Sequence, residues 1–138
     1  MFIENCSLID AKTGNHYDAG PRGVLIQITD PAFPAPQPAA KFDRIVQFEF
    51  LDAEDEDGYP DETKISWEQA ESIAQLLLWA KGERRNVIVH CHAGICRSGA
   101  VAEVGVMLGF DDAEKFRQPN LRVKRRLIEV LDRANAFA

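Results

Sequence analysis

Ten consecutive residues, His90 to Gly99, carry the side chains best suited to chemistry, and they run His-Cys-His-Ala-Gly-Ile-Cys-Arg-Ser-Gly. A thiolate is a strong nucleophile, and both a helix N-terminus and a neighbouring arginine stabilise it. We predict that Cys91 is this nucleophile. Arg97 lies six residues later, and its planar guanidinium can hold two oxygens of a phosphoryl group at once. The segment therefore predicts a site that binds and attacks an oxyanion.

The other residues of the segment supply the surroundings that such an anion needs. Gly94 and Gly99 suit places where the backbone turns sharply or approaches the anion closely, and the hydroxyl of Ser98 can hydrogen-bond the thiolate. His90 is expected to organise the loop backbone. The predicted contacts to the phosphoryl group come from the loop backbone and the guanidinium, over His92, Ala93, Gly94, Ile95, Cys96 and Arg97.

The expected reaction is an in-line attack of Cys91 on phosphorus. It gives a phosphocysteine that water then hydrolyses. This route requires no metal and no cofactor. It does require the loop to sit between a strand and a helix: the apolar run 86–89 predicts a buried strand ending at His90, and apolar residues at helical spacing predict a helix from Ser98 to about Gly109. The loop then lies at a strand's carboxyl end, beside a helix N-terminus that favours anions.

The segment HCHAGICRSG resembles the His-Cys-five-residues-Arg-Ser/Thr-Gly signature of the cysteine-dependent protein tyrosine phosphatases. The short chain is most similar to their compact dual-specificity branch. This resemblance implies a single-domain phosphatase-like α/β fold with a mostly parallel central sheet flanked by helices, and a phosphatase activity on phosphorylated proteins or small phosphomonoesters. It also implies a general acid, an Asp on a loop a few tens of residues before the cysteine.

A general acid is needed because an alkoxide or phenoxide must be protonated as it leaves. The alternating run 45–51 predicts a strand that ends at Asp52, and a side chain at a strand's end is held firmly. Asp52 is therefore the predicted acid. The acidic loop that follows also offers Asp55, Asp57 and Asp61 as alternatives, and its remaining carboxylates are interpreted as solvated.

Two positions of the loop bear on regulation and specificity. Cys96 precedes the arginine, as a cysteine does in the low-molecular-weight tyrosine phosphatases. That similarity suggests that Cys96 traps oxidised Cys91 as a reversible disulfide, although a small residue that fills space explains Cys96 equally well. The loop also lacks the lysines of inositol-phosphate-directed relatives. We therefore expect a low rim that admits phosphoserine and phosphothreonine as well as phosphotyrosine.

Length and charge set the broad class. With 138 residues, one domain spanning 1–138 is expected, and a monomer is favoured. The formal net charge of −6 argues against nucleic acid or an anionic membrane as a partner. Three cysteines, without a secretory pattern at the start or a long apolar run, indicate a reducing compartment, the cytoplasm.

The rest of the chain predicts an alternation of strands and helices. Its basic side chains near the end, Arg122 among them, are interpreted as a solvated helix face. The predicted elements are strands at 2–9 and 23–29, a helix at 66–81 with a Ser66–Gln69 capping box, a short helix begun by Asp111 or Asp112 and broken at Pro119-Asn120, and a last helix to about Ala134.

Three other functions compete with phosphate hydrolysis. A thiol-based arsenate reductase or a sulfurtransferase also uses a cysteine loop around an oxyanion, and Cys96 is compatible with both. A non-catalytic phosphate-binding module would not need both Cys91 and Arg97. A zinc site at His90, Cys91, His92 and Cys96 is disfavoured, because adjacent residues on a strand point to opposite faces.

Overall fold

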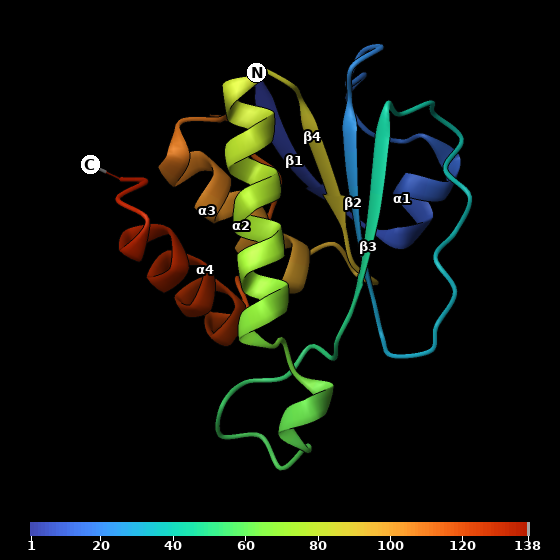
Figure 1. The fold of residues 1–138 in the computed structure, drawn as a ribbon. Helices are drawn as coiled ribbons and strands as arrows, with labels where there is room; N and C mark the ends of the chain where they lie inside the picture. The colour runs from blue at the N-terminus through green and yellow to red at the C-terminus, as the bar shows by residue number, and fades with distance from the viewer. Residues whose placement is uncertain (138) are drawn as a thin grey trace.

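The computed structural model describes residues 1–137 as an α/β fold built on one five-stranded sheet (Figure 1). The strand order is β3-β2-β4-β1-β5, and every neighbouring pair is parallel. The central strand β4 therefore ends between β1 and β2, where parallel sheets place their ligands. The strands are β1 (Phe2–Cys6), β2 (Val24–Thr29), β3 (Arg44–Glu49), β4 (Val87–His90) and β5 (Asp111–Asp112).

Helices cover both faces of the sheet. The helices α2, α3 and α4 lie on one face, and α1 lies on the other with the connection from β2 to β3 (Figure 1). The predicted capping box is confirmed: the Ser66 hydroxyl accepts from Gln69 N and the Gln69 side chain accepts from Ser66 N. The helices are α1 (Leu8–Thr13), α2 (Trp67–Gly82), α3 (Arg97–Leu108) and α4 (Leu121–Arg133), with a 3-10 turn η1 (Asp61–Thr63).

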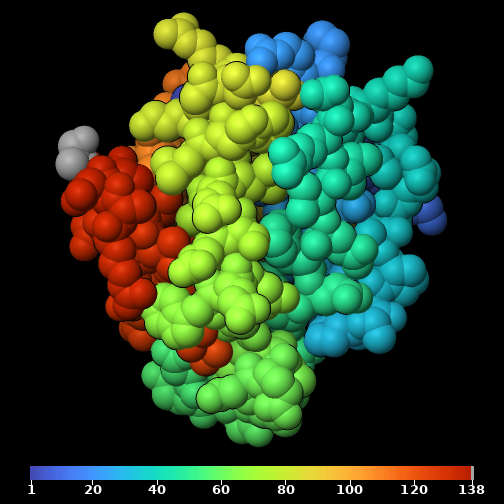
Figure 2. Space-filling view, in the orientation of Figure 1, coloured from blue at the N-terminus to red at the C-terminus, as the bar shows by residue number. Residues whose placement is uncertain are grey.

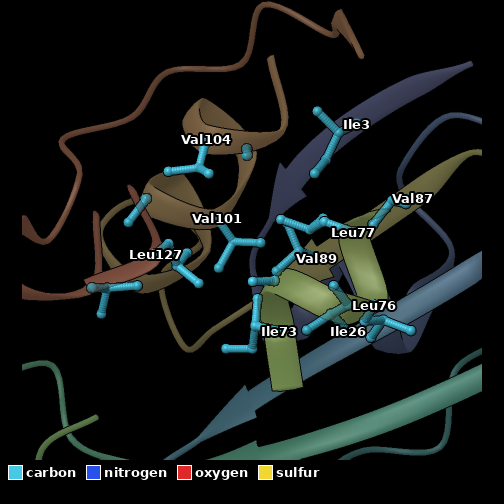
Figure 3. Packing of buried hydrophobic residues seen from close by; sticks show 14 of the residues in the cluster. Ile3, Ile26, Ile73, Leu76, Leu77, Val87, Val89, Val101, Val104 and Leu127 are labelled. Atoms are coloured by element: carbon cyan, nitrogen blue, oxygen red, sulfur yellow. The ribbon is translucent and has the colours of Figure 1, made fainter. Parts of the chain in front are cut away.

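The main core lies between the sheet and α2 and α3. Val89 of β4 meets Leu77 of α2 and Val101 of α3 within one buried cluster (Figure 3). A Cβ at Gly105 would lie 2.6 Å from Cδ1 of Ile3, so α3 packs closely against β1 at this glycine. This packing fixes the N-terminus of α3 beside the end of β4. No helix within residues 1–137 has both the length and the apolar character to cross a bilayer.

The structure corrects the predicted strand at 2–9. The strand β1 ends at Cys6, and α1 follows at once. Ser7 causes the change because its side chain accepts from Asp10 N and caps the helix. Gly14 ends the helix in a left-handed conformation. The apolar pattern of this stretch did not reveal the cap.

The short helix predicted after Asp111 is absent from the described chain. Asp111 and Asp112 instead form β5, parallel to β1. The N–H of Asp111 donates to Met1 O, and this long-range bond cannot be predicted from the local sequence. Glu114 adopts a φ of 59°, which is incompatible with a right-handed helix.

Two further predictions are corrected near the acidic loop. Strand β3 ends at Glu49, so Asp52 lies beyond the strand's end. Arg122 does not lie on a solvated face; it is buried, and its guanidinium donates to Ile65 O at 3.0 Å and to the Asp55 carboxylate at 2.9 Å. The first turn of α4 is therefore tied to the acidic loop.

Candidate active site

The loop of residues 91–96 joins β4 to α3 and holds the side chains that the sequence singled out. Its carbonyl oxygens accept hydrogen bonds from donors elsewhere in the chain, and the loop leads into the N-terminus of α3, a position that favours anions. Four carbonyls are held in this way: His92 O by Leu8 N at 3.1 Å, Gly94 O by Asn5 Nδ2 at 2.8 Å, Ile95 O by Gln118 N at 3.1 Å and Cys96 O by Asn120 N at 2.9 Å.

Gly94 is required by the loop for two separate reasons. Its φ is +79°, a conformation that other residues rarely adopt. A Cβ at this position would also lie 2.3 Å from the carbonyl carbon of Cys6 and 2.4 Å from Ser7 N. The loop is therefore packed against the backbone at the end of β1, and the tight turn expected at Gly94 is confirmed.

Cys91 lies at the base of the loop, with 3 % of its surface exposed. Its Sγ is 3.1 Å from the Oγ of Ser98 and 3.3 Å from the N–H of Gly94. Ser98 is fully buried in the first turn of α3. The sequence placed the Ser98 hydroxyl near this thiol, and the structure confirms that contact. A hydroxyl, a backbone N–H and a helix N-terminus thus lie beside the sulfur.

Arg97 is buried, and its guanidinium is held from one side. Its Nη1 donates to Oδ1 of Asp30 at 2.8 Å and to the carbonyl of Phe50 at 2.7 Å. Its Nε is buried and has no partner within the described chain. A buried donor without a partner is costly, and Arg97 also lines the pocket described below.

Asp30 is a site residue that sequence reasoning missed. It directly follows β2, the neighbour of β4, so its carboxylate reaches the same edge of the sheet as the loop. A polar residue at the carboxyl end of a strand next to β4 was the available signal. The strand order that makes β2 the neighbour of β4 is not evident from the sequence.

A pocket of about 310 Å³ opens over Cys91 and Arg97. Gly94 and Ile95, which were predicted to bind substrate, are not among its lining residues and can contribute only backbone N–H groups. Gly99 lies behind the loop, where a Cβ would be 2.8 Å from that of Arg117. The lining residues are Asp30, Leu51, Asp52, Tyr59, Cys91, His92, Ala93, Cys96 and Arg97.

Of the four candidate acids, Asp52 alone lines this pocket. Asp55 binds Arg122, as described above. The carboxylate of Asp57 accepts from Glu54 N at 2.7 Å. Asp61 is largely exposed and lies 3.7 Å from Lys64 Nζ. The side chain of Asp52 is oriented by Asn120, whose Nδ2 donates to its Oδ1 at 2.8 Å.

Hydrogen bonds hold the acidic loop after β3, both at its base and in its interior. It forms the lower end of the molecule, next to the start of α4 (Figure 2). Leu51 N donates to Thr63 O at 2.7 Å and closes the neck of the loop. Lys64 is 2 % exposed, and its Nζ donates to the carbonyls of Asp55 and Asp57. These bonds hold Asp52 in place even though it lies outside a strand.

Two titratable neighbours of Cys91 have shifted pKa values. Burial lowers the pKa of His90, which keeps its imidazole neutral. Its Nδ1 lies 3.2 Å from Cys91 O, so this nitrogen is the donor. Burial and the nearby Asp52 carboxylate raise the pKa of Cys96. His90 thus supports the loop backbone from within the core, and Cys96 is held as a protonated, free thiol.

The arrangement combines a thiol nucleophile, an anion cradle and a carboxyl group within one pocket. A scan of protein-family models and a search of curated proteins both find no match to this chain. Any statement of function therefore depends on the geometry of the pocket and on the chemistry of its residues.

Proposed function

We propose that this chain is a phosphomonoester hydrolase that acts through a phosphocysteine on Cys91 and needs no metal. The observation that carries the proposal is the orientation of the 91–96 loop. Four of its carbonyls are bonded elsewhere, the loop leads into the N-terminus of α3, and both Cys91 and Arg97 line the pocket. Such a cradle matches the three outer oxygens of a phosphoryl group undergoing in-line displacement.

In the first step the thiolate of Cys91 attacks phosphorus, so that an S–P bond forms while the ester P–O bond breaks. Asp52, as a neutral carboxylic acid, donates its proton to the departing oxygen, and the alcohol or phenol leaves. Loop N–H groups and Arg97 balance the charge on the phosphoryl oxygens throughout.

In the second step water attacks the phosphocysteine. The Asp52 carboxylate takes a proton from this water, the new P–O bond forms, and the S–P bond breaks. The released thiolate accepts hydrogen bonds from Ser98 and from Gly94 N, which makes it a better leaving group. Inorganic phosphate leaves, and both Cys91 and Asp52 return to their starting states.

The proposal also covers the fold family, the class of substrate and the location of the protein. The signature at His90 to Gly99 supports a phosphatase-like fold close to the dual-specificity branch, acting on a phosphorylated protein or a small phosphomonoester. Leu51, Tyr59 and Ala93 give the pocket an apolar wall for the body of such a substrate. The three free thiols support a reducing, cytoplasmic location.

The direct test is hydrolysis of p-nitrophenyl phosphate by the purified chain in EDTA with a reductant. We expect turnover that persists in EDTA and is inhibited by vanadate, and a rapid quench should leave phosphate on the peptide that holds Cys91. Failure to hydrolyse the ester would refute the proposal. If the same preparation then reduced arsenate at the expense of an added thiol, the reductase alternative would replace it.

The role of Asp52 gives a second prediction. The Asp52→Asn variant should lose roughly 10²- to 10⁴-fold in kcat on phenyl phosphate, the usual contribution of a general acid. The descending limb of the pH–kcat profile that reflects loss of the acid's proton should disappear, because asparagine carries no such proton. Asp57→Asn is the matched control: it alters a carboxylate of the same loop that is bonded to Glu54 N. A normal pH profile in Asp52→Asn would exclude Asp52 as the acid.

A further inference from the structure

Asn120 is buried where α4 meets both loops of the candidate site. It is 3 % exposed, and besides the helical bond from Lys124 N to its carbonyl it makes four hydrogen bonds. The backbone N–H donates to Cys96 O in the phosphate-binding loop at 2.9 Å, and Oδ1 caps α4 by accepting from Val123 N at 3.0 Å. The Nδ2 group donates to Asp52 Oδ1 at 2.8 Å and to Ala53 O at 3.1 Å.

We propose that Asn120 is a positioning residue that fixes Asp52 as the proton donor and couples its location to the phosphate-binding loop. This inference rests on the proposed function. Both Nδ2 hydrogens are directed at the segment that carries Asp52, so the amide sets both the backbone and the carboxylate. Because Oδ1 of Asp52 accepts from Asn120, the proton of the neutral acid is carried by Oδ2, the oxygen left to meet the substrate.

The fold around Asn120 does not depend on the Asn120 side chain alone. Glu54 accepts from Leu121 N at 2.7 Å and from Arg122 N at 2.9 Å, so α4 and the acidic loop stay joined without the Asn120 amide. Serine is as good an N-cap as asparagine. Asn120→Ser therefore keeps the cap on Val123 N, retains the backbone bond to Cys96 O and removes only the two Nδ2 donors.

The test compares two aryl phosphates whose leaving groups differ in basicity. Phenoxide must be protonated as it leaves, whereas dinitrophenoxide leaves without a proton. Asn120→Ser should lower kcat/KM on phenyl phosphate by about 10- to 100-fold, a large part of the general-acid contribution. It should change kcat/KM on dinitrophenyl phosphate by less than about threefold, since kcat/KM covers only the steps through phosphocysteine formation and the nucleophile and the cradle stay intact. Thermal unfolding of each variant reports whether the fold survives.

A double-mutant cycle separates positioning from a general structural effect. If Asn120 acts through Asp52, adding Asn120→Ser to Asp52→Asn should cause no further loss on phenyl phosphate. Equal losses on both substrates, or losses that add in the double variant, would overturn the inference. A wild-type chain that hydrolyses neither ester overturns the proposed function and this inference together. A wild-type chain that hydrolyses both, with Asn120→Ser indistinguishable from it, overturns the inference alone.

Discussion

Replacing Cys91 by serine should lower kcat by roughly 10⁴-fold or more, the scale seen when a catalytic nucleophile is removed. The surroundings of Sγ, with the Gly94 N–H, the Ser98 hydroxyl and the α3 N-terminus, stabilise a sulfur anion. They cannot ionise a serine hydroxyl, whose proton is held far more tightly. Steady-state hydrolysis of p-nitrophenyl phosphate measures the loss.

The other two cysteines provide matched controls for this variant. Burial raises the pKa of Cys6 to about 12, so it is inert as a nucleophile near neutral pH, and Cys6→Ser should remain active. Cys96→Ser should retain turnover as well, because serine can take the place of the thiol beside Asp52. The Cys91→Ser variant should still bind inorganic phosphate, measured calorimetrically, because the cradle is unchanged. Substantial turnover by Cys91→Ser would contradict a phosphocysteine route.

The same controls address the redox prediction for Cys96. A disulfide with oxidised Cys91 requires Cys96 to react as a thiolate, and its raised pKa slows that reaction near neutral pH. Protection of Cys91 by a disulfide thus stays a prediction. Mass spectrometry after mild peroxide distinguishes a Cys91–Cys96 disulfide from Cys91 sulfinic acid.

The conformation of the 91–96 loop was predictable because its determinants are local. Strand, loop and helix follow one another between residues 86 and 109, and Gly94, Arg97 and Ser98 occupy fixed offsets from Cys91. This spacing brings the Ser98 hydroxyl and the Gly94 N–H to the thiol of Cys91. The capping box at Ser66 was predictable for the same reason, since both of its partners lie within one helical turn.

The residues that complete the site depend on contacts far apart in the chain. Asp30 reaches Arg97 only because β2 lies beside β4, and Asn120 reaches Asp52 across 68 positions. Asp52 was predicted for its place at the end of a strand, yet β3 stops earlier and the carboxylate is held by Asn120 instead. The burial of Arg122 similarly follows from the acidic loop folding against α4. No local pattern encodes these contacts.

Replacing Arg97 by lysine should lower kcat/KM by roughly 10³-fold, a loss typical of removing an arginine that stabilises a phosphoryl transition state. Arg97 is anchored through Nη1 to Asp30 and to Phe50 O, and its side chain lines the pocket beside Cys91. A lysine has one nitrogen and cannot hold both positions. Kinetics on p-nitrophenyl phosphate, together with phosphate as a competitive inhibitor, separate lost binding from lost catalysis.

Arg97→Ala should be worse than Arg97→Lys, because it leaves the carboxylate of Asp30 in the pocket without its partner. An unpaired carboxylate repels the incoming phosphoryl group. Adding Asp30→Asn to Arg97→Ala should therefore recover part of the lost kcat/KM, and the recovery should shrink at high ionic strength. Asp30→Asn alone keeps an acceptor for Nη1, and Phe50 O still holds the guanidinium, so this single variant should cost little. Near-normal kcat/KM in Arg97→Lys would show that the guanidinium does not bind the reacting phosphoryl group.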